Sequence, residues 1–317
     1  MCIRDRYQPA KEFSSTSSPV SPLIIWRLVS SPFDLGELHS TFVETPFGAN
    51  LIGYRLWPPE IEPGDALHVT LTWQATQRIT EPFNAVVRII SPLDGAAWAQ
   101  RDETMPRSVP ADWWLPDQII NERLVLTTTA EIPVGAFQVN VSLRRYWPLE
   151  LAPVYQDHDV SPLDRVLLGY VAVPQEDLFL PQTAEPVGAV FGDQIALRSM
   201  ALEGELMPGG ELVVTLYWEA LRPPDSDYTV FVHLIDGQGT MLSGHDDRPM
   251  MGRYTTLAWQ PGHSVSDEHR ISFPAASQAA EYQLRIGLYI AETGDRLGVS
   301  DSPWVAPAGD MIILPIE

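Results

Sequence analysis

The densest group of side chains able to bind a metal lies near residue 240. His233 and Asp236 occur in FVHLIDGQG, and His245, Asp246 and Asp247 follow in SGHDDRP. Imidazole and carboxylate groups bind zinc or calcium, so a hairpin joining the two segments would offer a metal site. Asp-Gly and Gln-Gly are also typical turn sequences. We favour the turn interpretation, and therefore predict no metal and no cofactor.

Motifs of common catalytic sites do not occur in the sequence. It contains neither a G-x-S-x-G nucleophile motif nor a G-x-x-x-x-G-K-[ST] phosphate loop. Cys2 is the only cysteine, which excludes an internal disulfide and a cysteine metal cluster. The 41 acidic residues leave a carboxylate pair for glycoside hydrolysis open, but abundance alone does not indicate one. We expect that this chain is not an enzyme.

Tryptophan suggests a ligand more directly, because exposed aromatic rings can stack on sugar rings. Trp147 lies in RRYWPLE beside Tyr146 and Arg145, and Trp113 directly precedes Trp114. Neighbours in an extended segment point to opposite sides, so Trp113 faces outward if Trp114 packs inward. We predict Trp113, Trp147, Tyr146 and Arg145 as glycan-stacking candidates. The alternative is that both outward tryptophans cover hydrophobic edges next to the neighbouring module.

The segments that would position these residues occur twice in the sequence. LHVTLTWQA at 67–75 and LVVTLYWEA at 212–220 are identical at six of nine positions, 145 residues apart. FQVNVSL at 137–143 parallels YQLRIGL at 282–288 in the same way. A period of this length is too long for a solenoid or a propeller blade, so it indicates two complete domains in tandem.

Each copy has the alternation of a β-strand with one buried face. Apolar residues occupy every second position of 67–75, and polar residues fill the positions between them. Sheets with one apolar face bury it against each other. We therefore predict an all-β fold of two tandem antiparallel β-sandwich domains, immunoglobulin-like or jelly-roll-like. The tryptophans shared by the two copies are predicted core residues: Trp73, Trp218, Trp114 and Trp259.

Composition shifts place the expected boundaries. Residues 1–35 form a Ser- and Pro-rich leader or spacer, and MCIRDR at its start resembles an adapter remnant from assembled environmental DNA. Module 1 spans 36–174 and module 2 spans 189–317. The segment 175–188 lacks alternation and is the predicted linker.

Charge excludes one class of partner. The net charge is −21, and such an acidic surface repels phosphates, so we expect no nucleic-acid partner. No apolar run reaches the roughly 20 residues that span a bilayer, so we expect this piece itself to be soluble.

Module 2 also resembles a known family. PGGELVVTLYWEALRPPDSDYTVFVHLIDGQG, GRYTTLAWQPG and YQLRIGLYIAETGDRL are similar to a module at the C-terminal end of bacterial membrane proteins like those of glycosyltransferase family 39. Module 1 matches more loosely and departs at 91–114. The resemblance implies a non-catalytic, extracytoplasmic accessory module whose membrane-embedded part is missing upstream. A secreted or surface carbohydrate-binding or adhesion module is the alternative, with a glycan or a cell-envelope protein as partner.

Overall fold

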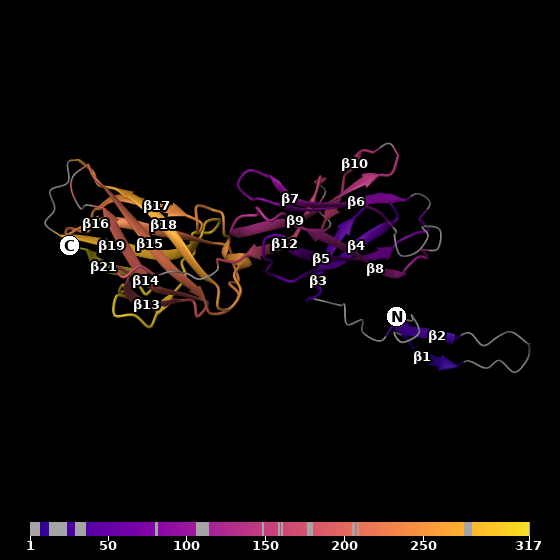
Figure 1. Cartoon of the computed structure of the whole chain (residues 1–317), viewed down its shortest axis with the longest axis horizontal. Coiled ribbons are helices and arrows are strands. Elements are labelled where there is room, and N and C mark those ends of the chain that lie inside the picture. The colour runs from indigo at the N-terminus through magenta and orange to yellow at the C-terminus, as the bar shows by residue number, and fades with distance from the viewer. Residues whose placement is uncertain are drawn as a thin grey trace, which may run out of the picture.

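The structure of the chain is a computed structural model, shown in Figure 1. It describes residues 36–79, 82–105, 114–147, 149–157, 159, 161–175, 180–204, 207, 209–275 and 281–316, together with the backbones of strands β1 (Tyr7–Glu12) and β2 (Ile24–Leu28). Regular structure in these ranges is mostly β-strand, which confirms the predicted all-β class. A short 3-10 helix, η3, spans Thr256–Ala258. None of the described helical residues forms an apolar helix long enough to cross a membrane.

Module 1 is a sandwich of two antiparallel sheets. The first sheet has the order β11-β3-β4-β5-β8. Its strands are β3 (His39–Glu44), β4 (Ala49–Trp57), β5 (Ala66–Ala75), β8 (Ile119–Thr127) and β11 (Tyr155–Gln156). In the second sheet β6 pairs with β7 and β9, and β10 and β12 both pair with β9. Its strands are β6 (Phe83–Ile90), β7 (Ala97–Met105), β9 (Gly135–Arg145), β10 (Leu151–Ala152) and β12 (Val166–Val173).

Module 2 repeats this topology. One sheet has the order β18-β15-β14-β13-β20, and the other has the order β17-β16-β19-β21. The first comprises β13 (Glu185–Phe191), β14 (Ile195–Gly204), β15 (Glu211–Ala220), β18 (Ser264–Ser272) and β20 (Val299–Ser300). The second comprises β16 (Tyr228–Asp236), β17 (Met241–Asp247), β19 (Tyr282–Ile290) and β21 (Ile312–Ile316).

The duplication extends to an irregularity in the strand register. The pairing of β4 with β5 shifts between Leu51 and Gly53, and that of β14 with β15 shifts between Leu197 and Ser199. In both modules the residue before the shift lies opposite the central tryptophan of the duplicated strand. A β-bulge at the same place in both copies shows that the repeated sequence specifies the same local structure.

The inner faces of each sandwich form a dry core. The central tryptophans, Trp73 and Trp218, are at most 1% exposed. Each packs edge-on against a phenylalanine, Trp73 at 5.3 Å from Phe83 and Trp218 at 5.6 Å from Phe191. The second shared pair, Trp114 and Trp259, is fully buried as well.

One expected boundary needs correction. Strand β13 begins at Glu185, inside the segment predicted as linker, and Glu185 and Pro186 pair with Met200 and Ser199 of β14. The segment lacks the strict alternation of a strand because a register shift follows Pro186. Module 2 therefore starts at 185 and not at 189.

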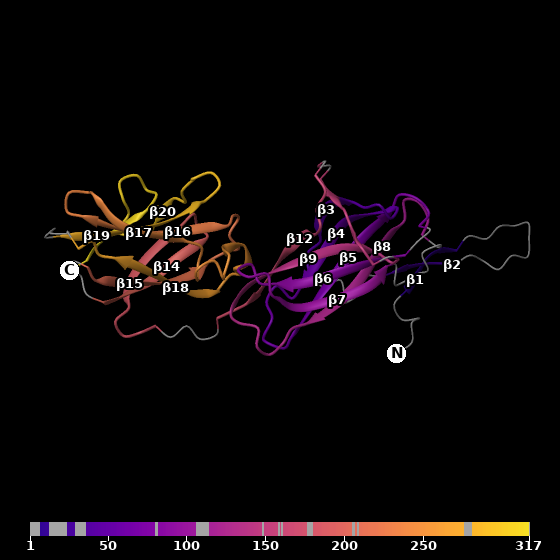
Figure 2. The same cartoon turned by 90° about the horizontal axis from the view of Figure 1, so that it is seen from above.

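The two modules lie end to end along the long axis and contact each other directly (Figures 1 and 2). Ala136 and Ala172 belong to strands of module 1 but pack into the core of module 2. The Ala136 amide donates a hydrogen bond to the Arg253 carbonyl at 2.9 Å. Gly135 precedes it with φ 148°, and a Cβ at this position would lie 2.8 Å from the Arg253 carbonyl oxygen. The close approach of the two backbones therefore needs glycine.

A buried histidine completes the contact. His263 Nδ1 accepts a hydrogen bond from the Gln260 amide at 3.2 Å and lies 2.9 Å from the Tyr254 hydroxyl. Because Nδ1 is an acceptor, the proton sits on Nε2. Nε2 lies 2.8 Å from Glu60 Oε1 of module 1, within ion-pair distance but off the axis of a regular hydrogen bond. Burial, and secondarily the Glu60 charge, raises the pKa of Tyr254 well above its ordinary value.

Candidate functional site

An exposed aromatic loop follows strand β9. Trp147 is 85% exposed and Tyr146 is 53% exposed, and Leu149 and Leu151 are also exposed. We call these four residues the aromatic tip. The loop is closed at its base, where Leu151 of β10 pairs with Arg144 of β9. Exposed apolar side chains gathered at one turn indicate a contact site.

The side chains of β9, the strand that leads to the aromatic tip, alternate between the core and the outer side of the sheet. Every second side chain of β9, from Phe137 to Leu143, enters the core of module 1. The intervening residues Gln138, Asn140, Ser142 and Arg144 therefore lie on the outer side of the sheet, where Asn140 and Ser142 are nonetheless buried by their neighbours. We call the outer surface of β7, β6, β9 and β12 the polar face, and Figure 2 shows β9, β6 and β7 side by side. The run from 138 to 144 is about 20 Å long, which suits a chain of sugars better than a single ring.

Strand pairing gathers three guanidinium groups on the polar face. Arg88 of β6 lies opposite Asn140, and its Nη1 lies 3.5 Å from Ser142 Oγ. Arg144 is two residues beyond Ser142 on the same face. Arg165 comes just before Val166, which pairs with Val141, so Arg165 lies next to Ser142 from the other side. We call Arg88, Arg144 and Arg165 the arginine triad.

The surroundings of Arg88 lower its pKa below the usual value. Burial lowers it first, and the positive charges of Arg144 and Arg165 lower it further. Asp102 on β7 acts in the opposite direction, as the weakest of the four causes. The triad is thus a patch of mutually repelling cations on a chain whose net charge is −21.

Amide groups occupy further positions of the polar face, beside the buried Val86 and Ile90 of β6. Gln100 Oε1 accepts a hydrogen bond from Arg88 Nε at 2.8 Å, and Asn140 Nδ2 donates one to Gln138 Oε1 at 3.4 Å. Asn84, opposite Arg144, has a buried Oδ1 without a hydrogen-bond partner. Amides offer both donors and acceptors and guanidiniums offer donors, which together can match sugar hydroxyl groups.

The corresponding face of module 2 holds a buried aromatic ring. Phe231 stands on the strand equivalent to β6 and is 1% exposed. Its ring fills the space over Gly287, where an added Cβ would lie 2.4 Å from the ring. The guanidinium of Arg296 covers the ring from above at 4.8 Å. Module 2 therefore carries an aromatic ring on this face, where module 1 carries arginines and amides.

The histidines and aspartates near residue 240 point to different sides of the sheet. Asp246 faces outward, with Oδ1 2.7 Å from His233 Nε2 and Oδ2 accepting a hydrogen bond from Tyr289. His245, its neighbour, faces inward, with Nδ1 2.9 Å from His269 Nδ1. Asp236 Oδ1 accepts hydrogen bonds from the backbone amides of Gln238 and Thr240 in the turn that follows, at 2.9 and 2.8 Å. Within the described ranges, no three His, Cys, Asp or Glu side chains come together as a metal site.

His269 belongs instead to a buried polar pair. Its Nε2 lies 2.8 Å from Asp267 Oδ2, and both residues are 1% exposed. The other carboxylate oxygen accepts a hydrogen bond from the Met250 amide at 2.8 Å. These contacts join β17, the loop that follows β17, and β18. The pair therefore closes one edge of the module 2 sandwich.

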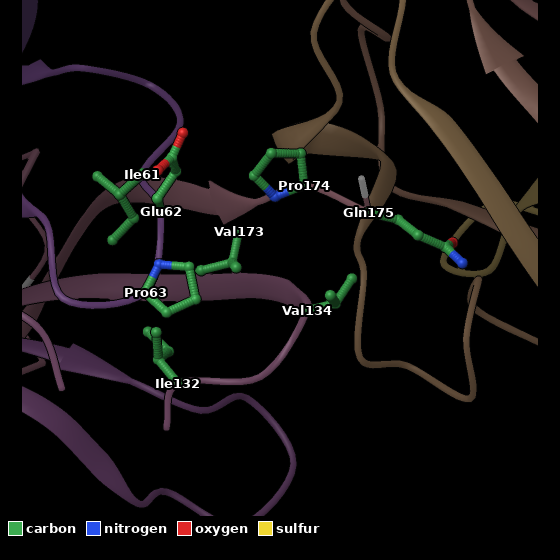
Figure 3. A pocket seen from close by; sticks show the side chains of 8 residues that line it. All are labelled: Ile61, Glu62, Pro63, Ile132, Val134, Val173, Pro174 and Gln175. Carbon is green, nitrogen blue, oxygen red and sulfur yellow. The ribbon is translucent and has the colours of Figure 1, made fainter. Parts of the chain in front are cut away.

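A pocket of about 370 Å³ lies at the end of module 1 that faces module 2 (Figure 3). Its lining is mostly apolar: Ile61, Glu62, Pro63, Ile132, Val134, Val173, Pro174 and Gln175. The side-chain oxygen of Gln175 already accepts a hydrogen bond from the Ser266 amide of module 2 at 3.2 Å. Of the polar side chains that line the pocket, Glu62 therefore remains to bind a ligand. One carboxylate is too little to indicate which kind of ligand the pocket would hold.

The predicted site residues are only partly placed. Tyr146, Trp147 and Arg145 lie together and exposed at the aromatic tip. Trp113 lies outside the described residues. The prediction missed Arg88 and Arg165, because strand pairing brings them to Ser142 and no local motif marks them. The polar alternation of 138–144 was a signal available in the sequence.

Comparisons with known proteins add little. No protein-family model matches the chain, and no curated protein matches it. A solved structure described as pT26-6p is similar over 89% of this chain and 65% of its own, at 7% identity and a TM-score of 0.26. The b-glucuronidase from Ruminococcus gnavus in complex with D-glucuronic acid is similar over 80% of this chain and 36% of its own, at 11% identity and a TM-score of 0.20. The chain thus spans less than two thirds of either protein, and these scores support no inference about its function.

Proposed function

We propose that this chain is a non-catalytic carbohydrate-recognition unit, and that module 1 carries the binding site. The exposure of Trp147 beside the polar face is the observation that supports it. A sugar ring would stack on the indole, and its hydroxyl groups would bond to the amides and guanidiniums behind it. Among the described groups of this face, Asp102 is the carboxylate, whereas glycoside hydrolysis uses a pair.

In this proposal the chain is the extracytoplasmic accessory part of a bacterial membrane protein resembling glycosyltransferase family 39. The support is the resemblance of module 2 to such C-terminal modules. Module 1 would then hold a glycan substrate or an envelope glycan near the membrane-embedded part. A free surface module that binds the same glycans is the alternative.

The test is a glycan array probed with the full chain, followed by Trp147→Ala. Removing a central tryptophan from a binding site typically costs about 2 kcal/mol or more, so we expect about 30-fold weaker binding. Trp304→Ala is the matched control, because Trp304 is a partly exposed tryptophan of module 2, at 38%. Trp147→Phe should retain part of the affinity, since a ring remains for stacking.

Two results would contradict the proposal. One is an array on which the chain binds no glycan. The other is equal loss of binding in Trp147→Ala and Trp304→Ala, because the tryptophan of module 2 would then matter as much as the tip.

A further inference from the structure

We infer that the polar face of module 1 selects acidic carbohydrates over neutral ones, with the arginine triad binding the negative group. This inference rests on the proposed function and names its ligand class. Neutral sugars need hydrogen-bond donors but gain nothing from charge. Three guanidiniums around one serine exceed that need, and they suit a carboxylate or a sulfate.

Two members of the triad have no carboxylate partner among the described residues. Within the described part of the chain, no ion pair involves Arg144 or Arg165. Two arginines on the sheet surfaces of module 2 are paired in this way, Arg198 with Glu219 and Arg270 with Glu211. Leaving like charges together and unpaired destabilises the free protein, and an anionic ligand would remove that cost.

The position of the triad relative to the aromatic tip supports the same ligand. Arg144 is on the outer face two residues before Tyr146, and Leu151 of the tip pairs with it. A sugar stacked on Trp147 would therefore place the next ring of an oligosaccharide over Arg144 and Ser142. Guanidiniums bind oxyanions with two parallel hydrogen bonds, which would fix the register of the chain on the sheet.

The local character of the patch explains how an acidic protein could bind an acidic ligand. At physiological ionic strength charges are screened beyond about 8 Å, so distant carboxylates oppose binding only weakly. The negative group would then experience the triad and the adjacent Asp102. Asp102 is exposed and has the smallest effect among the charges acting on Arg88.

The experiment compares acidic polymers with neutral counterparts of the same backbone. The full chain is titrated with polygalacturonate and its methyl ester, and with dextran sulfate and dextran, at a constant 0.15 M salt. We expect at least one acidic polymer to bind about tenfold or more tightly than its neutral counterpart. The pair that shows the preference identifies the anion as a carboxylate or a sulfate.

Matched arginine variants locate the preference. Arg144→Gln with Arg165→Gln should reduce affinity for the acidic polymer at least tenfold and leave any affinity for the neutral one unchanged. Arg270→Gln with Arg198→Gln removes the same charge from module 2 and should change neither.

The outcomes separate this inference from the proposed function. Equal affinity within both polymer pairs, with binding lost in Trp147→Ala, would overturn the acidic preference and leave carbohydrate binding in place. An acidic preference that the module 2 control pair also abolishes would overturn the arginine triad as its source. Failure of the chain to bind any polymer or array glycan would overturn both proposals.

Discussion

Replacing Trp218 by alanine tests the description of the duplicated strand. The indole of Trp218 is 1% exposed and packs edge-on against Phe191 at 5.6 Å. Truncation of a large buried side chain removes its transfer free energy and leaves a cavity that the neighbours fill only in part. We expect Trp218→Ala to lower the free energy of unfolding by about 3–5 kcal/mol.

The indole nitrogen refines the expectation. Trp218 Nε1 is buried without a hydrogen-bond partner, whereas Trp259 Nε1 donates to the Tyr254 carbonyl at 3.3 Å. Trp218→Phe therefore loses volume but also relieves an unsatisfied donor, while Trp259→Phe breaks a hydrogen bond worth about 1 kcal/mol. Trp218→Phe should be the milder of the two phenylalanine variants.

The assay is urea unfolding of the full chain, followed by hydrogen exchange of peptides from β14, β15 and β16 so that module 2 is observed alone. With a urea dependence of about 2 kcal/mol per molar, a loss of about 4 kcal/mol moves the midpoint by about 2 M. A loss below about 1 kcal/mol for Trp218→Ala would refute the reasoning, because such a value is typical of surface positions.

Two further predictions concern the module junction. The pKa of Tyr254 in the folded protein is raised above the unfolded value of 10.0, so the neutral phenol contributes stability that is present below that pH and is lost as pH rises above it. Tyr254→Phe should therefore flatten the alkaline fall in melting temperature between pH 9 and about 11.5. An unchanged slope would contradict this prediction. Residues 185–317 expressed alone should melt cooperatively, but at a lower temperature than module 2 in the full chain. The reason is that the contacts of module 2 with Ala136, Ala172 and Glu60 of module 1 are then missing. An unfolded product, or one as stable as the intact chain, would contradict the contact described.

The sequence predicted the scaffold well for a physical reason. Period-two alternation and a duplicated strand can be recognised locally in the sequence. Strands with one apolar face form sheets that bury this face against each other, which favours a sandwich. Trp73, Trp114, Trp218 and Trp259 are buried where the repeat puts them. The start of module 2 was misplaced because the register shift after Pro186 interrupts the alternation.

The site was harder to predict because it depends on pairing between distant strands. Trp147 and Tyr146 were predicted as candidates from their local context, and both are exposed because they lie in a turn after a strand. Arg88 and Arg165 are 77 residues apart in sequence, and pairing through β9 brings both to Ser142. The converse holds for His245 and Asp246, which are adjacent in sequence but point to opposite sides of β17.

The most direct test of carbohydrate recognition by module 1 is a heteronuclear NMR titration of the nitrogen-15-labelled full chain with the glycan that binds most tightly. The account predicts shifts of the Trp147 indole N–H and of the Arg144 and Arg165 Nε–H signals, while the Trp304 indole signal stays in place. Shifts confined to module 2, or none at a saturating glycan concentration, would contradict it.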